Sequence, residues 1–206
     1  ALGSRDFMTA SNLLNVTLQT SIIAIVAIGM TFTILTAGID LSVGSLMALG
    51  GAMPAGLAVR QGLGTYGGIA GALLVGMLLG AINGLLIIKG KMPPFVATLA
   101  MMAIARGLTL VYTQGRPIAG LEKDFIFWGT GRLLGIPVPV ILLAILALIA
   151  YVVLRYTRFG LYVYATGGNE ETTRLAGVSS ERIKLAVYII SGFTAILLLA
   201  DKCHRY

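Results

Sequence analysis

Charged residues are scarce in this chain of 206 residues, and their scarcity limits what the protein can be. Only 11% of the residues are charged, against about 25% in ordinary soluble domains, whereas 57% are hydrophobic. The apolar residues gather into runs of about 16 to 23 residues, long enough to cross roughly 30 Å of hydrocarbon as helices. A soluble chain of this size would show amphipathic periods instead. The composition predicts an all-α integral membrane protein.

Residues that carry out catalysis or bind metals are equally sparse. The single cysteine, Cys203, excludes an internal disulfide, and beside the single histidine, His204, it forms no metal-site pattern. A phosphate-binding G-x-x-x-x-G-K-[ST] loop is absent, because Met92 follows Lys91 where a hydroxyl is required. No Ser/His/Asp set or H-E-x-x-H motif occurs. We therefore expect no catalytic residues, no metal and no cofactor bound by this chain.

Acidic residues are missing from every apolar run, since none occurs between Asp40 and Glu122 or in the later runs. An ion-driven secondary transporter would be expected to carry a titratable carboxylate within a span. Asp40 lies at a short polar turn, which counts against that class. The same absence argues against dinucleotide binding at the G-x-G-x-x-G pattern of residues 62–67, because no acidic residue follows and no strand precedes it.

The basic residues give a net charge of +7, but they are spread between the apolar runs. This spread favours topology signals and contacts with anionic lipid over nucleic-acid binding. One set of loops carries seven bases and the other carries five, so the first set is predicted to be cytoplasmic. The first set is Lys89, Lys91, Arg155, Arg158, Arg174, Arg182 and Lys184, and the second is Arg5, Arg60, Arg116, Lys123 and Arg132.

The apolar runs predict a polytopic helical bundle with about six transmembrane or partly re-entrant segments. The second segment contains Gly44, Gly50, Gly51, Pro54 and Gly56, which predict a kinked or partly re-entrant helix surrounded by protein. The sixth run is stopped by Asp201 and is short for a full crossing. The predicted segments are residues 18–37, 42–59, 66–88, 93–112, 137–154 and 185–200, with a cytoplasmic loop at 155–184 and a tail at 201–206.

Small residues recur every fourth position in two of these segments. In a helix this spacing lines one face and lets a second backbone approach closely. A pore wall is the alternative interpretation, and helix packing is favoured. The residues are Gly68, Ala72, Gly76, Gly80 and Gly84 in the third segment, and Gly44, Ala48, Ala52 and Gly56 in the second.

A few polar residues lie inside the runs. Arg106 is consistent with two positions, one facing the bundle interior or a water-filled path and one reaching toward the outer interface. Asn83 and a threonine cluster offer hydrogen bonds to a sugar, or they satisfy one another across helices, which is the favoured interpretation. The threonines are Thr31, Thr33 and Thr36.

The polar stretch 155–184 contains the signals of a short capped helix. Glu170 and Glu171 open it, where negative charge is favourable, and Gly177 fits a left-handed C-terminal cap. Ser179 or Ser180 can cap the next helix. Such a helix between two spans suits docking into a groove on a partner. A solvated loop would not need this succession of acidic residues, apolar residues and glycine.

Three blocks of sequence resemble the permease subunits of bacterial ribose-type ABC sugar importers, and the likeness runs from about Phe7 to Leu198. The first block contains Gly38-Ile39-Asp40-Leu41-Ser42-Val43-Gly44-Ser45, the second Pro94-Phe95-Val96-Ala97-Thr98-Leu99 with Arg106-Gly107, and the third Tyr164-Ala165-Thr166-Gly167-Gly168-Asn169-Glu170-Glu171.

The resemblance implies a multi-pass permease domain of the bacterial inner membrane that imports a monosaccharide, with ribose the first choice. It implies three protein partners: a second permease copy, ATP-binding subunits that hold ATP and Mg²⁺, and a periplasmic sugar-binding protein. The segment that contacts the ATPase would be Asn169, Glu170, Glu171, Thr172, Arg174, Leu175, Ala176 and Gly177. Our candidates for the substrate path are Asp40, Ser42, Asn83, Thr98 and Arg106.

The chain also departs from the family pattern. Thr172 and Thr173 replace small residues of the coupling segment. Family members have a membrane helix before Ala1 and several after Leu199, and residues 201–206 do not resemble the family's continuation. We therefore expect a chain truncated at both ends. An ion-driven transporter and a nonfunctional membrane fragment are the alternatives.

Overall fold

The computed structural model describes residues 9–116, 118, 120, 123–133 and 135–197, and this part of the chain is almost entirely helical. The predicted all-α fold is confirmed. In chain order the elements are α1 (Ala10–Leu35), α2 (Val43–Val59), α3 (Gly64–Ile88), α4 (Pro94–Thr113), α5 (Lys123–Thr130), β1 (Arg132–Leu133), β2 (Ile136–Pro137), α6 (Val138–Tyr156), α7 (Arg158–Gly168), α8 (Glu170–Leu175) and α9 (Ser180–Ile196).

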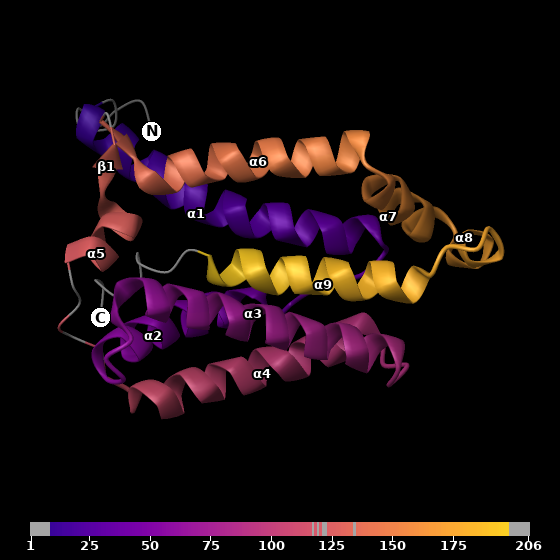
Figure 1. Ribbon diagram of the computed structural model, residues 1–206, viewed down its shortest axis with the longest axis horizontal. Coiled ribbons are helices and arrows are strands. Elements are labelled where there is room, and N and C mark those ends of the chain that lie inside the picture. Colours follow the sequence, from indigo (N-terminus) through magenta and orange to yellow (C-terminus); the bar gives the residue numbers. More distant parts are fainter. Residues whose placement is uncertain (1–8, 117, 119, 121–122, 134, 198–206) are drawn as a thin grey trace, which may run out of the picture.

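The long helices lie side by side along one axis (Figure 1). Helix α6 packs against α1, α1 against α9, α9 against α3, α3 against α2, and α2 against α4. The short helix α5 and the β1–β2 hairpin lie at one end of this bundle, and α7 and α8 lie at the other. Helix α9 is therefore central, with α1 and α3 on either side.

Four of the predicted spans correspond to helices that are long and apolar enough to cross a membrane. These are Asn12–Leu35 of α1, and α3, α4 and α6 in full. Helix α2 is apolar but shorter, with 17 residues, and α9 also has 17 residues. Residues 198–200 of the sixth predicted span and the tail at 201–206 lie outside the described residues.

The second predicted segment is one helix, although it contains Pro54 and several glycines. Neighbouring helices fill the space beside these glycines: Ile196 packs against Gly50, and the ring of Tyr112 packs against Gly56. These residues therefore allow α2 to lie close to α9 and α4, and most of the helix is buried, as a segment surrounded by protein should be.

The small residues of α3 form a packing face, as the favoured interpretation predicts. A Cβ on Gly76 would lie 2.6 Å from the carbonyl oxygen of Gly192, and one on Gly80 would collide with the backbone of Tyr188. Close backbone approach of α3 to α9 explains why glycine occupies these positions. The corresponding stripe on α2 is used only in part, because a Cβ on Gly44 would meet no neighbouring atom within 4 Å.

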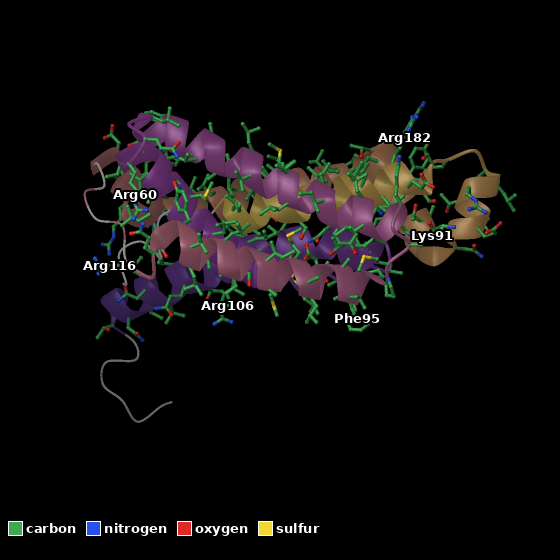
Figure 2. The ribbon with its side chains drawn as sticks, turned by 90° about the horizontal axis from the view of Figure 1, so that it is seen from below. Arg60, Lys91, Phe95, Arg106, Arg116 and Arg182 are labelled. Carbon is green, nitrogen blue, oxygen red and sulfur yellow. The ribbon has the colours of Figure 1, made fainter. Side chains whose placement is uncertain are left out.

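Basic residues of the two predicted sets of loops lie at opposite ends of the bundle. Figure 2 shows Arg60 and Arg116 at one end and Lys91 and Arg182 at the other. At the first end, Arg60 Nη1 donates to the carbonyl oxygen of Tyr112 at 2.7 Å, which ties the end of α2 to the end of α4. The arrangement agrees with the alternating topology predicted from the positive charges.

Candidate functional site

The turn between α1 and α2 carries a carboxylate into the protein interior. Asp40 is fully buried, and its two oxygens accept three hydrogen bonds. The backbone N–H and the hydroxyl of Ser42 donate to Oδ1 at 3.0 and 2.6 Å, and the hydroxyl of Ser191 donates to Oδ2 at 2.7 Å. Because a buried charge is costly unless it is satisfied, these donors keep Asp40 compatible with the interior. Its place just before α2 adds the positive end of that helix.

Asn83 on α3 extends this group of side chains. Its Nδ2 donates to Ser42 Oγ at 3.0 Å, and Asn83 is fully buried. Because the Ser42 hydroxyl already donates to Asp40, it must accept from Asn83, which fixes the orientation of the amide. Asn83 Oδ1 has no hydrogen-bond partner within the described residues. We call Asp40, Ser42, Asn83 and Ser191 the buried polar network.

Thr98 lies beside the network without joining it directly. Its hydroxyl donates to the carbonyl oxygen of Pro94 at 2.9 Å and lies 3.4 Å from that of Ile39, the residue before Asp40. The hydroxyl of Tyr188 donates to the same Ile39 oxygen at 3.3 Å. The α1–α2 turn is therefore contacted from α3, α4 and α9.

Arg106 stands apart from the other candidates of the substrate path. It lies on α4, is exposed in this chain, and points away from the bundle in Figure 2. The favoured interpretation that the threonines bond across helices is wrong, because each hydroxyl donates to a carbonyl oxygen of α1: Thr31 to Ala27, Thr33 to Met30, and Thr36, just after the helix, to Thr33. Four of the five candidates thus come together, and Arg106 does not.

Sequence reasoning missed Ser191 and Tyr188, which contact Asp40 and its neighbour. Both lie on α9, where Tyr188, Ser191 and Thr194 follow one another at intervals of three. This spacing places three hydroxyls on one face of a helix. A polar stripe in an otherwise apolar segment is the signal that would have identified them.

The predicted short helix in the stretch 155–184 is α8. The side chain of Asn169 accepts from the N–H of Thr172 at 3.0 Å and caps its start. Gly177 has φ +81°, its N–H donates to Arg174, and the N–H of Val178 donates to Thr173. This pair of bonds forms a Schellman cap. The predicted glycine cap is confirmed, as is Ser179 at the start of α9, whose side chain accepts from Arg182 N–H.

One ion pair joins α8 to α9, and a second lies within α8. Lys184 in the second turn of α9 pairs with Glu170, and Arg174 pairs with Glu171 at 3.3 Å. The hydrogen bond from Lys184 lowers the pKa of Glu170 below its ordinary value, and Ser180 and Arg174 act in the same direction. These are the only ion pairs that the described part of the chain shows. The ion pairs of these residues therefore lie at one end of the bundle.

Leu175 is the most exposed large apolar side chain of the described residues, at 81%. It lies at the end of α8, which projects beyond the long helices (Figure 1). Thr173 faces the opposite way and is buried, with its hydroxyl donating to the carbonyl oxygen of Asn169. Helix α8, which is capped at both ends, thus exposes the side chain of Leu175.

No group of three or more metal-binding side chains occurs in the part of the chain that the structure describes. The arrangement offers two chemically distinct regions. One is a buried set of hydroxyl, amide and carboxylate groups, and the other is an exposed, charged and capped helix with an apolar tip.

Comparison with known proteins identifies a family of membrane permeases that matches most of the chain. Residues 12–198 match the permease family described as "Branched-chain amino acid transport system / permease component". The chain is 47% identical over 196 residues to the ribose import permease of Haemophilus influenzae, covering 93% of this chain and 60% of that protein. It is 46% identical over 198 residues to the ribose import permease of Escherichia coli K12, covering 94% and 61%.

The D-allose transport system permease of E. coli K12 is 38% identical over 195 residues, covering 95% of this chain and 60% of that protein. The chain thus spans about 60% of the length of these curated relatives. No solved structure matches it. The helices that suit a bilayer and the match over residues 12–198 lead to one conclusion: the chain is a multi-pass inner-membrane protein and belongs to the family of permease components of branched-chain amino acid transport systems.

Proposed function

We propose that this chain forms part of the membrane-spanning subunit of an ATP-driven importer for a monosaccharide, with ribose as the substrate. Its identity to ribose import permeases is 45–47%, compared with 37–38% to permeases named for D-allose, galactofuranose and fructose. The protein holds no nucleotide itself. ATP and Mg²⁺ bind to a partner subunit, a periplasmic protein delivers the sugar, and a second permease copy completes the membrane part.

The exposed Leu175 at the tip of α8 is the observation that carries the ATP-driven mechanism. An apolar side chain that is 81% exposed on a capped helix outside the membrane suits a groove on a partner protein. The helix forms through its own caps and ion pairs, so little ordering would be needed when the partner binds. The coupling residues of this proposal are those of the segment 169–177.

Co-purification tests this proposal directly. The tagged protein, extracted from its membrane in mild detergent, should retain an ATP-binding subunit that carries a phosphate-binding loop, identified by mass spectrometry and by ATP hydrolysis. Leu175→Ser should remove most of that hydrolysis. Leu161→Ser on α7 is the matched control, because Leu161 is also exposed but lies outside the segment. Equal capture by both variants would contradict the assignment of the coupling segment.

The substrate path is proposed to pass beside the buried polar network. Asn83 Oδ1 is an acceptor that the described residues leave unpaired, and a sugar hydroxyl is a suitable donor. Uptake of radiolabelled ribose, allose and galactose by cells that express the protein would establish the order of preference. Asn83→Ala is expected to change that order, whereas an unchanged order with normal expression would remove Asn83 from the path.

The burial of Asp40 is the one feature that favours an ion-driven alternative, because such transporters use intramembrane carboxylates. Its three hydrogen bonds and the family membership favour the ATP-driven mechanism. Uptake into vesicles distinguishes the two mechanisms. ATP supplied on the side of the membrane that carries the ATP-binding subunit should support uptake without an ion gradient. Uptake that needs only the gradient would establish the alternative.

A further inference from the structure

Helix α9 connects the cytoplasmic helix α8 to the buried polar network. Near the start of α9, Lys184 pairs with Glu170 of α8, and Glu170 also interacts with Ser180. Seven residues later, Ser191 donates to Asp40 at 2.7 Å. Since a helix rises 1.5 Å per residue, the two contacts lie about 10 Å apart along one rigid element. A displacement of α8 is therefore carried to Asp40 without a flexible joint between them.

The contact at Asp40 is directional, whereas the neighbouring contact of α9 is not. Against α3, α9 presents backbone to glycine: Gly192 lies on Gly76, and Tyr188 lies on Gly80. The Ile196 side chain also packs against Gly76, so these are van der Waals contacts with no donor–acceptor geometry to maintain. The hydrogen bond from Ser191 to a buried charge, in contrast, has a preferred length and angle. Movement of α9 would consequently be felt at Asp40 and at the carbonyl oxygen of Ile39 beside it, which accepts from Tyr188 of the same helix.

Asp40 passes a displacement on to two further elements. Its Oδ1 holds Ser42, the residue that precedes α2, through both the backbone N–H and the hydroxyl. Ser42 in turn accepts from Asn83 of α3. The four side chains thus join α9, the α1–α2 turn and α3 in one chain of hydrogen bonds within the protein interior.

We propose that the hydrogen bond from Ser191 to Asp40 transmits movement of α8 to the α1–α2 turn and so couples ATP hydrolysis to transport. The inference depends on the proposed function. Ser191 and Asp40 are positioning residues, because they act through α2 and α3 rather than on ATP. Loss of this bond should leave the ATPase active while less sugar moves for each ATP consumed.

The test uses the complete transporter reconstituted with its ATP-binding subunit in proteoliposomes. Ser191→Ala should retain ATP hydrolysis but lower the ratio of sugar transported to ATP hydrolysed by roughly tenfold, the effect of losing one hydrogen bond to a charged group. Ser21→Ala is the matched control. Ser21 is equally buried, but its hydroxyl donates to Leu18 of its own helix, so the ratio should not change.

A second variant, outside the membrane, keeps the proposal testable if Ser191→Ala does not fold. Lys184→Gln breaks the first link of the same route and should also lower the ratio. Combined with Ser191→Ala, it should lower the ratio no further than the stronger single change, because both lie in series. Independent, additive losses would overturn the proposal, and so would an unchanged ratio in Ser191→Ala. Failure of the wild-type protein to couple ATP to transport would refute the proposed function itself.

Discussion

The backbones of Gly76 and Gly192 close against each other at the contact between α3 and α9. A Cβ on Gly76 would lie 2.6 Å from the carbonyl oxygen of Gly192, and a Cβ on Gly192 would collide with the carbonyl oxygen of Gly76. Neither residue has room for a methyl group, and the obstacle on each side is backbone. This contact determines how closely α9 approaches α3, and therefore where Ser191 lies.

Gly76→Ala should lower the stability of the bundle by about 1–3 kcal/mol, because the added methyl forces two backbones apart. Gly107→Ala on α4 is the matched control, since no atom lies within 4 Å of its added Cβ. There, replacing a helical glycine should be neutral or stabilising by up to about 1 kcal/mol. Thermal unfolding of both variants in the same detergent checks this difference. Equal stability would mean that the α3–α9 contact is not as close as the structure has it.

Gly177→Ala should destabilise the end of α8 by about 1–2 kcal/mol, because an L residue is strained at a left-handed φ of +81°. The amide protons of α8 should exchange faster with solvent, as measured by hydrogen–deuterium exchange. Gly168→Ala provides the control, because this glycine also ends a short helix in open space but has no positive φ. Similar exchange in the two variants would show that the cap contributes little.

The topology can be tested with single cysteines introduced after Cys203→Ser. In intact cells, a membrane-impermeant maleimide should label Arg132→Cys of β1 at once. It should label Lys91→Cys, between α3 and α4, only after the inner membrane is permeabilised. The expected difference follows from the excess of bases at the end that carries Lys91 and Arg182 (Figure 2). The reverse pattern would invert the bundle and place α8 outside the cell.

Much of the fold could be predicted from the sequence because a membrane span is encoded by a long continuous signal. The apolar lengths identified α3, α4 and α6 to within a few residues. The start of α1 was missed, since its first turns are polar and Thr9 caps the helix well before Leu18. Helix α7 was also missed, because its start depends on one local hydrogen bond, from Gly160 N–H to the side chain of Thr157.

The candidate site was less predictable, since its members are far apart in the chain. Asp40 and Ser191 are 151 residues apart, and nothing local to either residue indicates the other. Asp40 was expected at a polar turn, and the turn is indeed there: Ile39 and Leu41 on either side are exposed, whereas the side chain of Asp40 is buried in the bundle. Local signals were sufficient to predict α8, because an N-terminal cap and a C-terminal glycine cap each depend on a few adjacent residues.

The carboxyl group of Glu170 should titrate below its ordinary pKa of 4.5, because Lys184, Ser180 and Arg174 favour its charged form. A lowered pKa means that the stabilisation of α8 is fully present above pH 4.5 and is lost as the pH falls through the lower, folded-state value. The side-chain carboxyl resonance of Glu170 in ¹³C NMR reports this midpoint. In Lys184→Gln the midpoint should move upward, because the largest cause of the lowering is removed.

Arg182→Gln is the control, since Arg182 forms no ion pair among the described residues and its loss should leave the midpoint in place. An equal shift in both variants would mean that general positive charge, rather than the contact with Lys184, sets the charge state of α8.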